Sequence, residues 1–255
     1  MKDSKITVMI QARTSSTRLP RKVLEFIDHK PMIWHVINRV KQIPSVEQIA
    51  LITTTDNDDK ILLDIANENK IIGFSGQKFD VLDRHYQCAK QINADPIIRI
   101  TSDCPLIDPF LVEKILKFYL KNNYDYVSNI FPPSFPDGLD TEIFSFDALE
   151  RAAKSANLAS EREHVSPYIT KNPSIFKIGN YENNQNLSDY RWTVDKPQDL
   201  EFVKTIYSRM KPKTIFSMDE VLNLISQEPT LMEIHKGSFR NEGYAKSVKN
   251  DYEIS

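Results

Sequence analysis

Residues 10–24 read IQARTSSTRLPRKVL, a run in which apolar residues give way to a dense cluster of cations and hydroxyls. The cations are Arg13, Arg18, Arg21 and Lys22, and the hydroxyls are Thr14, Ser15, Ser16 and Thr17. Arginine can bind two anionic oxygens at once, and lysine supplies a movable point charge. The run therefore predicts an anion-binding loop; the alternative is a solvated basic loop without a ligand.

The flanks of this loop indicate a strand before it and a helix after it. Residues 6–12 read as a buried strand, and residues 31–43 place Ile33, Val36 and Val40 on one helical face. A loop at the carboxyl end of a parallel strand can add backbone N–H donors and the dipole of the following helix to its side-chain charge. A triphosphate, with about four negative charges, fits such a loop.

Strand-like and helix-like segments go on alternating after this first unit, which is typical of an α/β fold with a largely parallel sheet. Further strands are expected at 48–54, 71–75, 96–101, 124–130, 141–146, 175–181 and 191–195. Helices are expected at 58–67, 80–92, 110–121, 146–156, 161–170, 198–210 and 218–227. The sequence therefore predicts a three-layer α/β/α fold with a mixed, mostly parallel sheet.

The chain is expected to form one domain over residues 1–230, with an acceptor-side or dimerisation insertion at about 131–190. The proline-rich FPPSFPDGLD at 131–140 reads as a long loop of the kind that covers a site. Residues 231–255 lack periodicity at their end and are expected to form a partly ordered tail.

Composition excludes several classes of protein. Lys and Arg number 33 against 35 Asp and Glu, so no overall charge draws the chain to nucleic acid or to an anionic membrane. Cys88 and Cys104 have no metal-like or redox-like spacing, and no signal or membrane-spanning segment is visible. We expect reduced thiols and a cytoplasmic protein that binds small molecules.

Two aspartates follow strand-like runs and are candidate metal ligands. Asp103 comes after PIIRIT, and Asp195 ends RWTVD. Carboxylates at the carboxyl edge of a parallel sheet suit Mg²⁺, which takes one or two of them together with phosphate oxygens. Each aspartate could instead cap a helix, since a proline follows shortly after both.

Other reaction classes find less support in the sequence. Walker, GxGxxG and GxSxG motifs are absent, which disfavours P-loop, dinucleotide-binding and serine-hydrolase interpretations. A glycosyltransferase would need a metal-binding Asp-x-Asp, and DNDD at 56–59 reads better as a helix cap. A non-catalytic nucleotide-binding protein is the other alternative.

Six blocks of the sequence, in order over roughly 200 residues, resemble the cytidylyltransferases of the SpsF type, relatives of the 3-deoxy-manno-octulosonate and acylneuraminate enzymes. They are IQARTSSTRLPRKVL (10–24), SGQKFDVLDRHYQCA (75–89), IIRITSDCPLIDP (97–109), PDGLDTEIFSFDALERA (136–152), EREHVSPYI (161–169) and RWTVDKPQDLEFV (191–203). Arg21 departs from the pattern, because the family usually has glycine there.

The resemblance implies a nucleotide-diphospho-sugar transferase-like fold and a homodimer. It also implies Mg²⁺-dependent transfer of a cytidylyl group from CTP to an acidic sugar or phosphorylated acceptor for surface polysaccharide. Its implied catalytic residues are Arg13, Lys22, Asp103 and Asp195, the two aspartates being the metal ligands. Its implied nucleotide-side residues are Ala12, Arg13, Ser15, Arg18, Lys22, Asp83, Arg84, Arg99 and Ser102.

Polar residues in and after the proline-rich loop are candidates for the acceptor side. They are Asp137, Asp140, Glu142, Arg162, Glu163 and His164. His164 could accept a proton or bind an anionic group, although a lone histidine on an amphipathic helix is more often structural.

Overall fold

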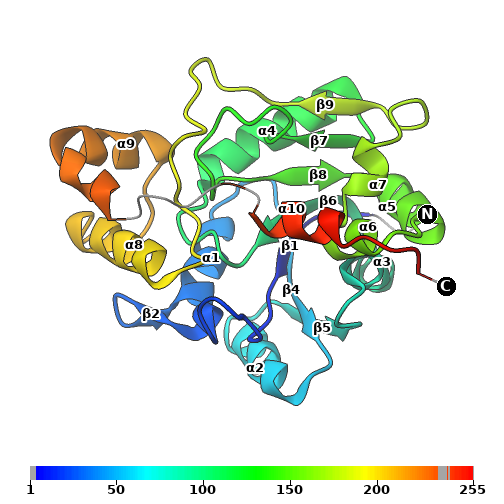
Figure 1. The fold of residues 1–255 in the computed structure, drawn as a ribbon, viewed down its shortest axis with the longest axis horizontal. Helices are drawn as coiled ribbons and strands as arrows, with labels where there is room; N and C mark the ends of the chain where they lie inside the picture. The colour runs from blue at the N-terminus through cyan, green and yellow to red at the C-terminus, as the bar shows by residue number, and fades with distance from the viewer. Residues whose placement is uncertain (1–3, 235–239, 241, 255) are drawn as a thin grey trace.

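A computed structural model describes residues 4–234, 240 and 242–254. Its main sheet has the strand order β5-β4-β1-β6-β8-β7-β9, from the bottom to the top of Figure 1. The strands are β1 (Lys5–Gln11), β4 (Gln48–Thr54), β5 (Ile72–Gly76), β6 (Ala94–Thr101), β7 (Tyr126–Ser128), β8 (Glu142–Phe144) and β9 (Ile178–Asn180). β8 is antiparallel to both neighbours, and the other pairs are parallel. The prediction of a mixed, mostly parallel sheet is confirmed.

Helices cover both faces of this sheet because alternate strand residues point to opposite sides. Val8 and Ile10 of β1 belong to one apolar core, whereas Met9 between them belongs to the other. The first core includes side chains of α1 (Met32–Val40), α2 (Lys60–Glu68), α4 (Pro109–Asn122), α8 (Pro197–Arg209) and α9 (Met218–Gln227). The second includes those of α3 (Val81–Ile92), α5 (Phe146–Ser155) and α7 (Pro167–Thr170). The predicted three-layer α/β/α arrangement is therefore confirmed.

The order of the strands reverses beside β1. From β1 the chain builds outward through β4 to β5, and then returns to add β6 on the other side of β1. In open α/β sheets the crevice at such a switch point, at the carboxyl ends of the strands, is where ligands bind. The loops after β1 and β6 border this crevice.

Local signals explain where the elements begin and end. Asp108 caps α4 by accepting a hydrogen bond from Phe110 N at 2.8 Å, and Pro109 occupies the first turn. Asn123 ends the helix in the left-handed conformation, with φ of 50°.

Two predicted elements are wrong. The helix expected at 161–170 is divided into α6 (Ala159–His164) and α7, because Val165 has φ of 74° and Pro167 starts a new turn. The strand expected at 191–195 is extended chain whose N–H groups bond to loops: Trp192 N donates to Asp137 O at 2.6 Å and Val194 N to Asp103 O at 2.8 Å. Those bonds take the place of a strand ladder.

Several short elements were not predicted. They are β2 (Phe26–Ile27), β3 (Lys30–Pro31), α10 (Glu242–Lys249) and the 3₁₀ turns η1 (Lys22–Leu24), η2 (Asn57–Asp59) and η3 (Pro229–Glu233). The predicted tail thus contains a helix, and after it Asp251 accepts bonds from Ser160 N and Oγ at 2.9 and 2.5 Å. The parts of that tail at 235–239, 241 and 255 lie outside the described residues. Within the described ranges, no helix has the length and apolarity to cross a membrane.

Candidate active site

The loops after β1 and β6 lie side by side at the carboxyl edge of the sheet. Gln11 and Thr101 are partners in the β1–β6 register, and Ser102 N donates to Gln11 O at 3.0 Å. The bond from Val194 N to Asp103 O adds the extended segment 191–195 to the same place. Three segments that are distant in the sequence thus meet at the switch point.

The ammonium of Lys22 lies between the two predicted metal ligands. Lys22 Nζ donates to Asp103 Oδ2 at 3.0 Å, to Asp195 Oδ1 at 2.9 Å and to Val194 O at 2.8 Å. Its side chain is 13% exposed. The structure therefore brings together three of the four residues predicted to be catalytic.

The charges in this cluster support one another. Burial alone would lower the pKa of Lys22, but Asp103 and Asp195 outweigh that effect and raise the pKa above its ordinary value. Burial alone would raise the pKa of Asp103, yet Lys22 and a hydrogen bond from Thr101 lower it to about 2. Lys22 is therefore protonated and Asp103 is ionised at neutral pH.

Two arginines complete the charge balance around Asp195. Arg18 Nη2 lies 2.7 Å from Asp195 Oδ1, and Arg191 Nη2 lies 2.8 Å from Asp195 Oδ2. Arg191 also approaches Asp137 Oδ2 at 2.6 Å and Asp199 Oδ1 at 3.6 Å. The sequence reasoning missed Arg191 and Asp199, although both belong to the RWTVDKPQD block that contains Asp195.

The backbone at Arg21 is in the left-handed region, which favours the glycine that the resemblance implies there. Arg21 has φ of 55° and ψ of 26°, immediately before the 3₁₀ turn that starts at Lys22. Glycine adopts this conformation without steric cost, whereas a residue with a Cβ is strained. Arginine is therefore not the residue best suited to this turn.

The oxygen donors at this point fit Mg²⁺. The carboxylates of Asp103 and Asp195 converge on one cation, the Lys22 ammonium. Among the described residues no group of three or more His, Cys, Asp or Glu side chains is arranged to hold a metal. The chain thus offers two carboxylates, and Mg²⁺ bound to a nucleotide takes its other ligands from phosphates and water.

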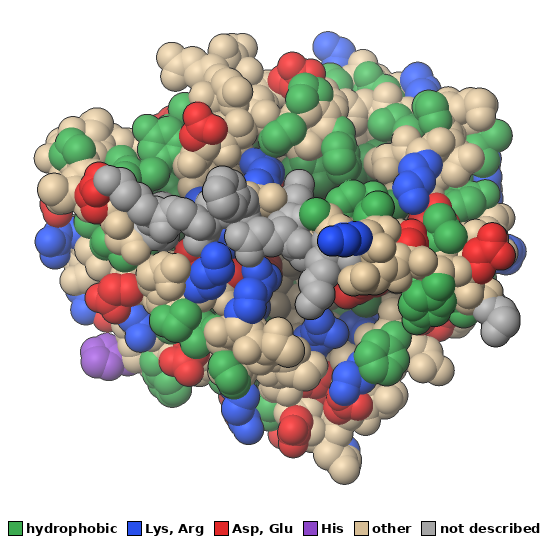
Figure 2. Space-filling view, in the orientation of Figure 1, with side chains coloured by type: hydrophobic (Ala, Val, Ile, Leu, Met, Phe, Trp, Pro, Cys, Tyr) green, Lys and Arg blue, Asp and Glu red, His purple; other side chains and the backbone are tan. Residues whose placement is uncertain are grey.

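The predicted nucleotide-side residues divide into two groups. Arg13 and Ser15 are exposed on the basic loop, and Ala12 and Ser102 are buried at the strand ends beneath it. Figure 2 shows Lys and Arg side chains gathered near the centre of the molecular face it displays.

The other group faces the protein. Arg84 is buried and donates to the carbonyls of Gln77 and Lys78, with Nε to Gln77 O at 3.0 Å. Asp83 lies one residue earlier on α3 and accepts from Gln87 Nε2 at 3.0 Å. Arg99 pairs with Glu142 and donates to Gln11 Oε1 through Nε at 3.2 Å. Arg84 and Arg99 are thus held by partners inside the protein, whereas Asp83 bonds to an exposed residue of its own helix.

Each of the three predicted acceptor-side carboxylates at 137–142 pairs with an arginine from another part of the chain. The pairs are Asp137 with Arg191, Asp140 with Arg240, and Glu142 with Arg99. Burial raises the pKa of Asp140 to about 7, opposed by Arg240 and reinforced by Asp137. Arg240 was not predicted, since no local motif marks it.

The three residues of α6 take separate positions. Arg162 Nη2 lies 2.6 Å from Asp80 Oδ2, which ties α6 to the start of α3. Glu163 is exposed and accepts from Ser247 Oγ at 2.9 Å. His164 packs edge-on against Tyr244 at 5.0 Å between ring centroids, and burial lowers its pKa. Its Nε2 is buried without a hydrogen-bond partner and lies 3.7 Å from Glu163 Oε2.

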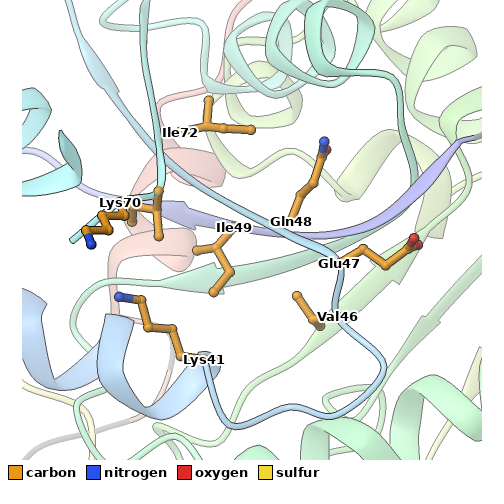
Figure 3. A pocket seen from close by; sticks show the side chains of 8 residues that line it. Lys41, Val46, Glu47, Gln48, Ile49, Lys70 and Ile72 are labelled. Atoms are coloured by element: carbon orange, nitrogen blue, oxygen red, sulfur yellow. The ribbon is translucent and has the colours of Figure 1, made fainter.

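A separate hollow of about 480 Å³ opens at the amino ends of β4 and β5 (Figure 3). It is lined by Lys41, Val46, Glu47, Gln48, Ile49, Lys70, Ile71 and Ile72. None of the predicted site residues lines it.

Comparison with known proteins shows the family to which the chain belongs. The family model described as "Cytidylyltransferase" matches residues 7–228. The chain is 34% identical over 244 residues to the uncharacterized protein MJ1063 of Methanocaldococcus jannaschii, covering 94% of this chain and 98% of the relative. It is 26% identical over 231 residues to the spore coat polysaccharide biosynthesis protein SpsF of Bacillus subtilis, covering 88% and 95%. A solved cytidylyltransferase from Leptospira borgpetersenii matches with a TM-score of 0.88 and 31% identity, covering 93% of this chain and all of that one.

Proposed function

The chain belongs to the cytidylyltransferase family and is therefore a nucleotidyltransferase. From this premise we propose that it transfers a cytidylyl group from CTP to an acidic sugar or a phosphorylated acceptor. The observation that carries the proposal is the meeting of Lys22, Asp103 and Asp195 beside the basic loop. A cation-rich loop and a carboxylate pair, side by side at a switch point, suit a triphosphate and its metal ion.

The chemistry is an in-line displacement at phosphorus. An acceptor oxygen attacks the α-phosphorus of CTP, the bond from that phosphorus to the pyrophosphate oxygen breaks, and the acceptor proton leaves to solvent or a basic group. Mg²⁺, held by Asp103 and Asp195, would neutralise charge on the phosphates. Arg13, Arg18 and Lys22 bind and orient the triphosphate, which keeps the α-phosphorus facing the acceptor.

The acceptor enters beside the proline-rich loop. Asp137, Asp140 and Glu142 lie there in ion pairs, and His164 is adjacent on α6. Polar side chains held by fixed partners are suited to hydrogen-bonding sugar hydroxyls, because they lose little freedom on binding. We place Arg162 and Glu163 at the periphery of this acceptor site.

Pyrophosphate release tests the proposal. Purified protein is incubated with each nucleoside triphosphate, Mg²⁺ and a panel of sugar acids, sugar phosphates and phosphonates. Release with CTP and one acidic acceptor is expected. Absence of release with every pair, together with hydrolysis of a ready-made nucleotide sugar, would overturn it in favour of a glycosyltransferase.

The glycosyltransferase alternative finds no metal centre at DNDD. Asp56 pairs with Lys78 at 2.5 Å, and Asp59 is 1% exposed and hydrogen-bonded to Thr14 and Thr54. Asp56 and Asp58 form the Asp-x-Asp, but no group of three or more His, Cys, Asp or Glu side chains that could hold a metal is found there or elsewhere in the described part of the chain. A non-catalytic role is disfavoured because Lys22, Asp103 and Asp195 are all present and assembled.

We further propose a cytoplasmic homodimer that serves surface polysaccharide synthesis. The support is the family resemblance together with exposed apolar side chains in the second half of the chain, such as Phe131 (52% exposed) and Ile175 (47%). Light scattering at micromolar concentration tests the oligomer: a monomeric mass would contradict it.

A further inference from the structure

Asp59 ends the DNDD motif and lies at the last position of η2, directly before α2. Its neighbour Asp58 is exposed, whereas Asp59 is 1% exposed. A carboxylate is rarely buried to this degree unless donors surround it. The contacts of Asp59 therefore show what it holds in place.

The carboxylate of Asp59 accepts three hydrogen bonds. Thr14 N and Thr14 Oγ1 donate to Oδ1 at 2.7 and 2.6 Å, and Thr54 Oγ1 donates to Oδ2 at 2.5 Å. Burial alone would raise the pKa of Asp59, but these bonds outweigh it and lower the pKa, so the group is ionised at neutral pH. Asp59 thus joins the end of β4 to the first turn of the basic loop.

Thr14 also holds the rest of the basic loop through its backbone carbonyl. Its carbonyl oxygen accepts hydrogen bonds from Ser16 N at 2.9 Å and from Arg21 N at 3.1 Å. The second bond holds the two ends of the loop segment 14–21 together. Arg21 is the residue with φ of 55°, and Lys22 follows it. The position of the Lys22 ammonium therefore depends on a loop whose anchoring residue, Thr14, is held by Asp59.

We propose that Asp59 is a positioning residue, which fixes residues 13–22 in the conformation that receives the triphosphate. The proposal rests on the proposed function of that loop. Asp59 is 1% exposed, so we place it out of contact with the nucleotide. A loop that is ordered before binding loses less conformational entropy when the ligand arrives, so Asp59 acts on nucleotide affinity.

The test compares Asp59→Ala with Asp58→Ala, a control one residue away on the same motif. CTP binding is measured by calorimetry with no acceptor present, and the KM values for CTP and acceptor are measured separately. Asp59→Ala is expected to weaken CTP binding on the order of tenfold and to leave the acceptor KM unchanged. Asp58→Ala is expected to bind CTP as the unaltered protein does.

Thr14→Val gives an independent test if Asp59→Ala does not fold. It keeps the shape of residue 14 and the backbone bond to Asp59 but removes the hydroxyl bond, so a smaller loss of CTP affinity is expected. Combined with Asp59→Ala, it is expected to add little, because both act through one contact. The CTP affinity of Asp59→Asn is expected to lie between those of Asp59→Ala and the unaltered protein, because the amide oxygen can still accept a hydrogen bond from Thr14.

Unchanged CTP affinity in folded Asp59→Ala and Thr14→Val would overturn the proposal. So would lower thermal stability with a reduced kcat but an unaltered KM for CTP, which is the signature of a merely structural role. Calorimetry separates this test from that of the proposed function: a protein that binds CTP through an Asp59-dependent loop but transfers nothing refutes the function alone.

Discussion

Lys22 Nζ and Asp103 Oδ2 lie 3.0 Å apart, although the two residues are separated by 81 positions in the sequence. The same ammonium reaches Asp195 Oδ1 at 2.9 Å, so one lysine bonds to both carboxylates that are proposed to hold the metal ion. A cation that binds a carboxylate pair competes with any other cation for it. At the proposed metal site, Lys22 and Mg²⁺ would therefore compete for these carboxylates in the nucleotide-free protein, and a bound triphosphate would relieve the competition by offering Lys22 new oxygen partners.

Lys22→Met is expected to bind Mg²⁺ more tightly than the unaltered protein when no nucleotide is present, because its carboxylates have lost their competing ammonium. The same variant is expected to lose roughly a hundredfold or more in kcat/KM, because the lysine no longer stabilises charge on the triphosphate. Calorimetric titration with Mg²⁺ and steady-state pyrophosphate release measure the two effects. Lys30→Met, at an exposed lysine of β3, is the control. Equal or weaker Mg²⁺ binding by Lys22→Met would show that no competition exists.

Asp103→Ala and Asp195→Ala are each expected to lower turnover by about a thousandfold or more while the fold remains intact, because each removes an oxygen donor from the metal site. Circular dichroism establishes the fold and pyrophosphate release the turnover. Asp64→Ala, at an exposed position of α2, is expected to retain full activity. Turnover at the unaltered rate in either site variant would remove that aspartate from the metal site.

Much of this site could be predicted because its residues follow strands. Asp103 and Lys22 lie in loops after predicted strands, and parallel strands bring their carboxyl ends to one edge. Asp195 ends a segment that was predicted to be a strand but is extended chain. Backbone hydrogen bonds from that segment to other loops determine its position. The resemblance, and not the strand prediction, indicated that Asp195 belongs with Asp103.

The partners toward which side chains point could not be predicted from the sequence. Arg99 alternates with Ile98 and Ile100 along β6, so it faces the layer opposite their core and pairs with Glu142. Arg162 points to Asp80, 82 residues away, and no local pattern reports such a partner. Contacts between residues far apart in the chain depend on the folded topology, which the spacing of residues in the sequence does not specify.

Arg21→Gly is expected to raise the free energy of unfolding by up to about 1 kcal/mol, because glycine adopts φ of 55° without strain. Arg21→Ala is the matched control, since it removes the same charge and keeps the Cβ. Urea denaturation of both variants measures the difference. If Arg21→Gly is no more stable than Arg21→Ala, the backbone at this position is not strained.

His85→Gln is expected to weaken the dependence of stability on acid pH. His85 is fully buried, its Nδ1 bonds to Val81 O at 2.8 Å, and burial with the nearby charge of Arg99 lowers its pKa to about 3 from 6.5. Between pH 3 and 6.5 the folded state binds fewer protons than the unfolded state. The contribution of His85 to the free energy of unfolding is therefore fully present above pH 6.5 and is lost as the pH falls toward 3, by at most ~1.4 kcal/mol per pH unit. Denaturation of His85→Gln at several pH values between 4 and 8 is expected to give a shallower slope below 6.5, whereas His29→Gln, at an exposed histidine, keeps the original slope. Parallel curves for the unaltered protein and His85→Gln would show that this histidine is not the group whose protonation opposes folding.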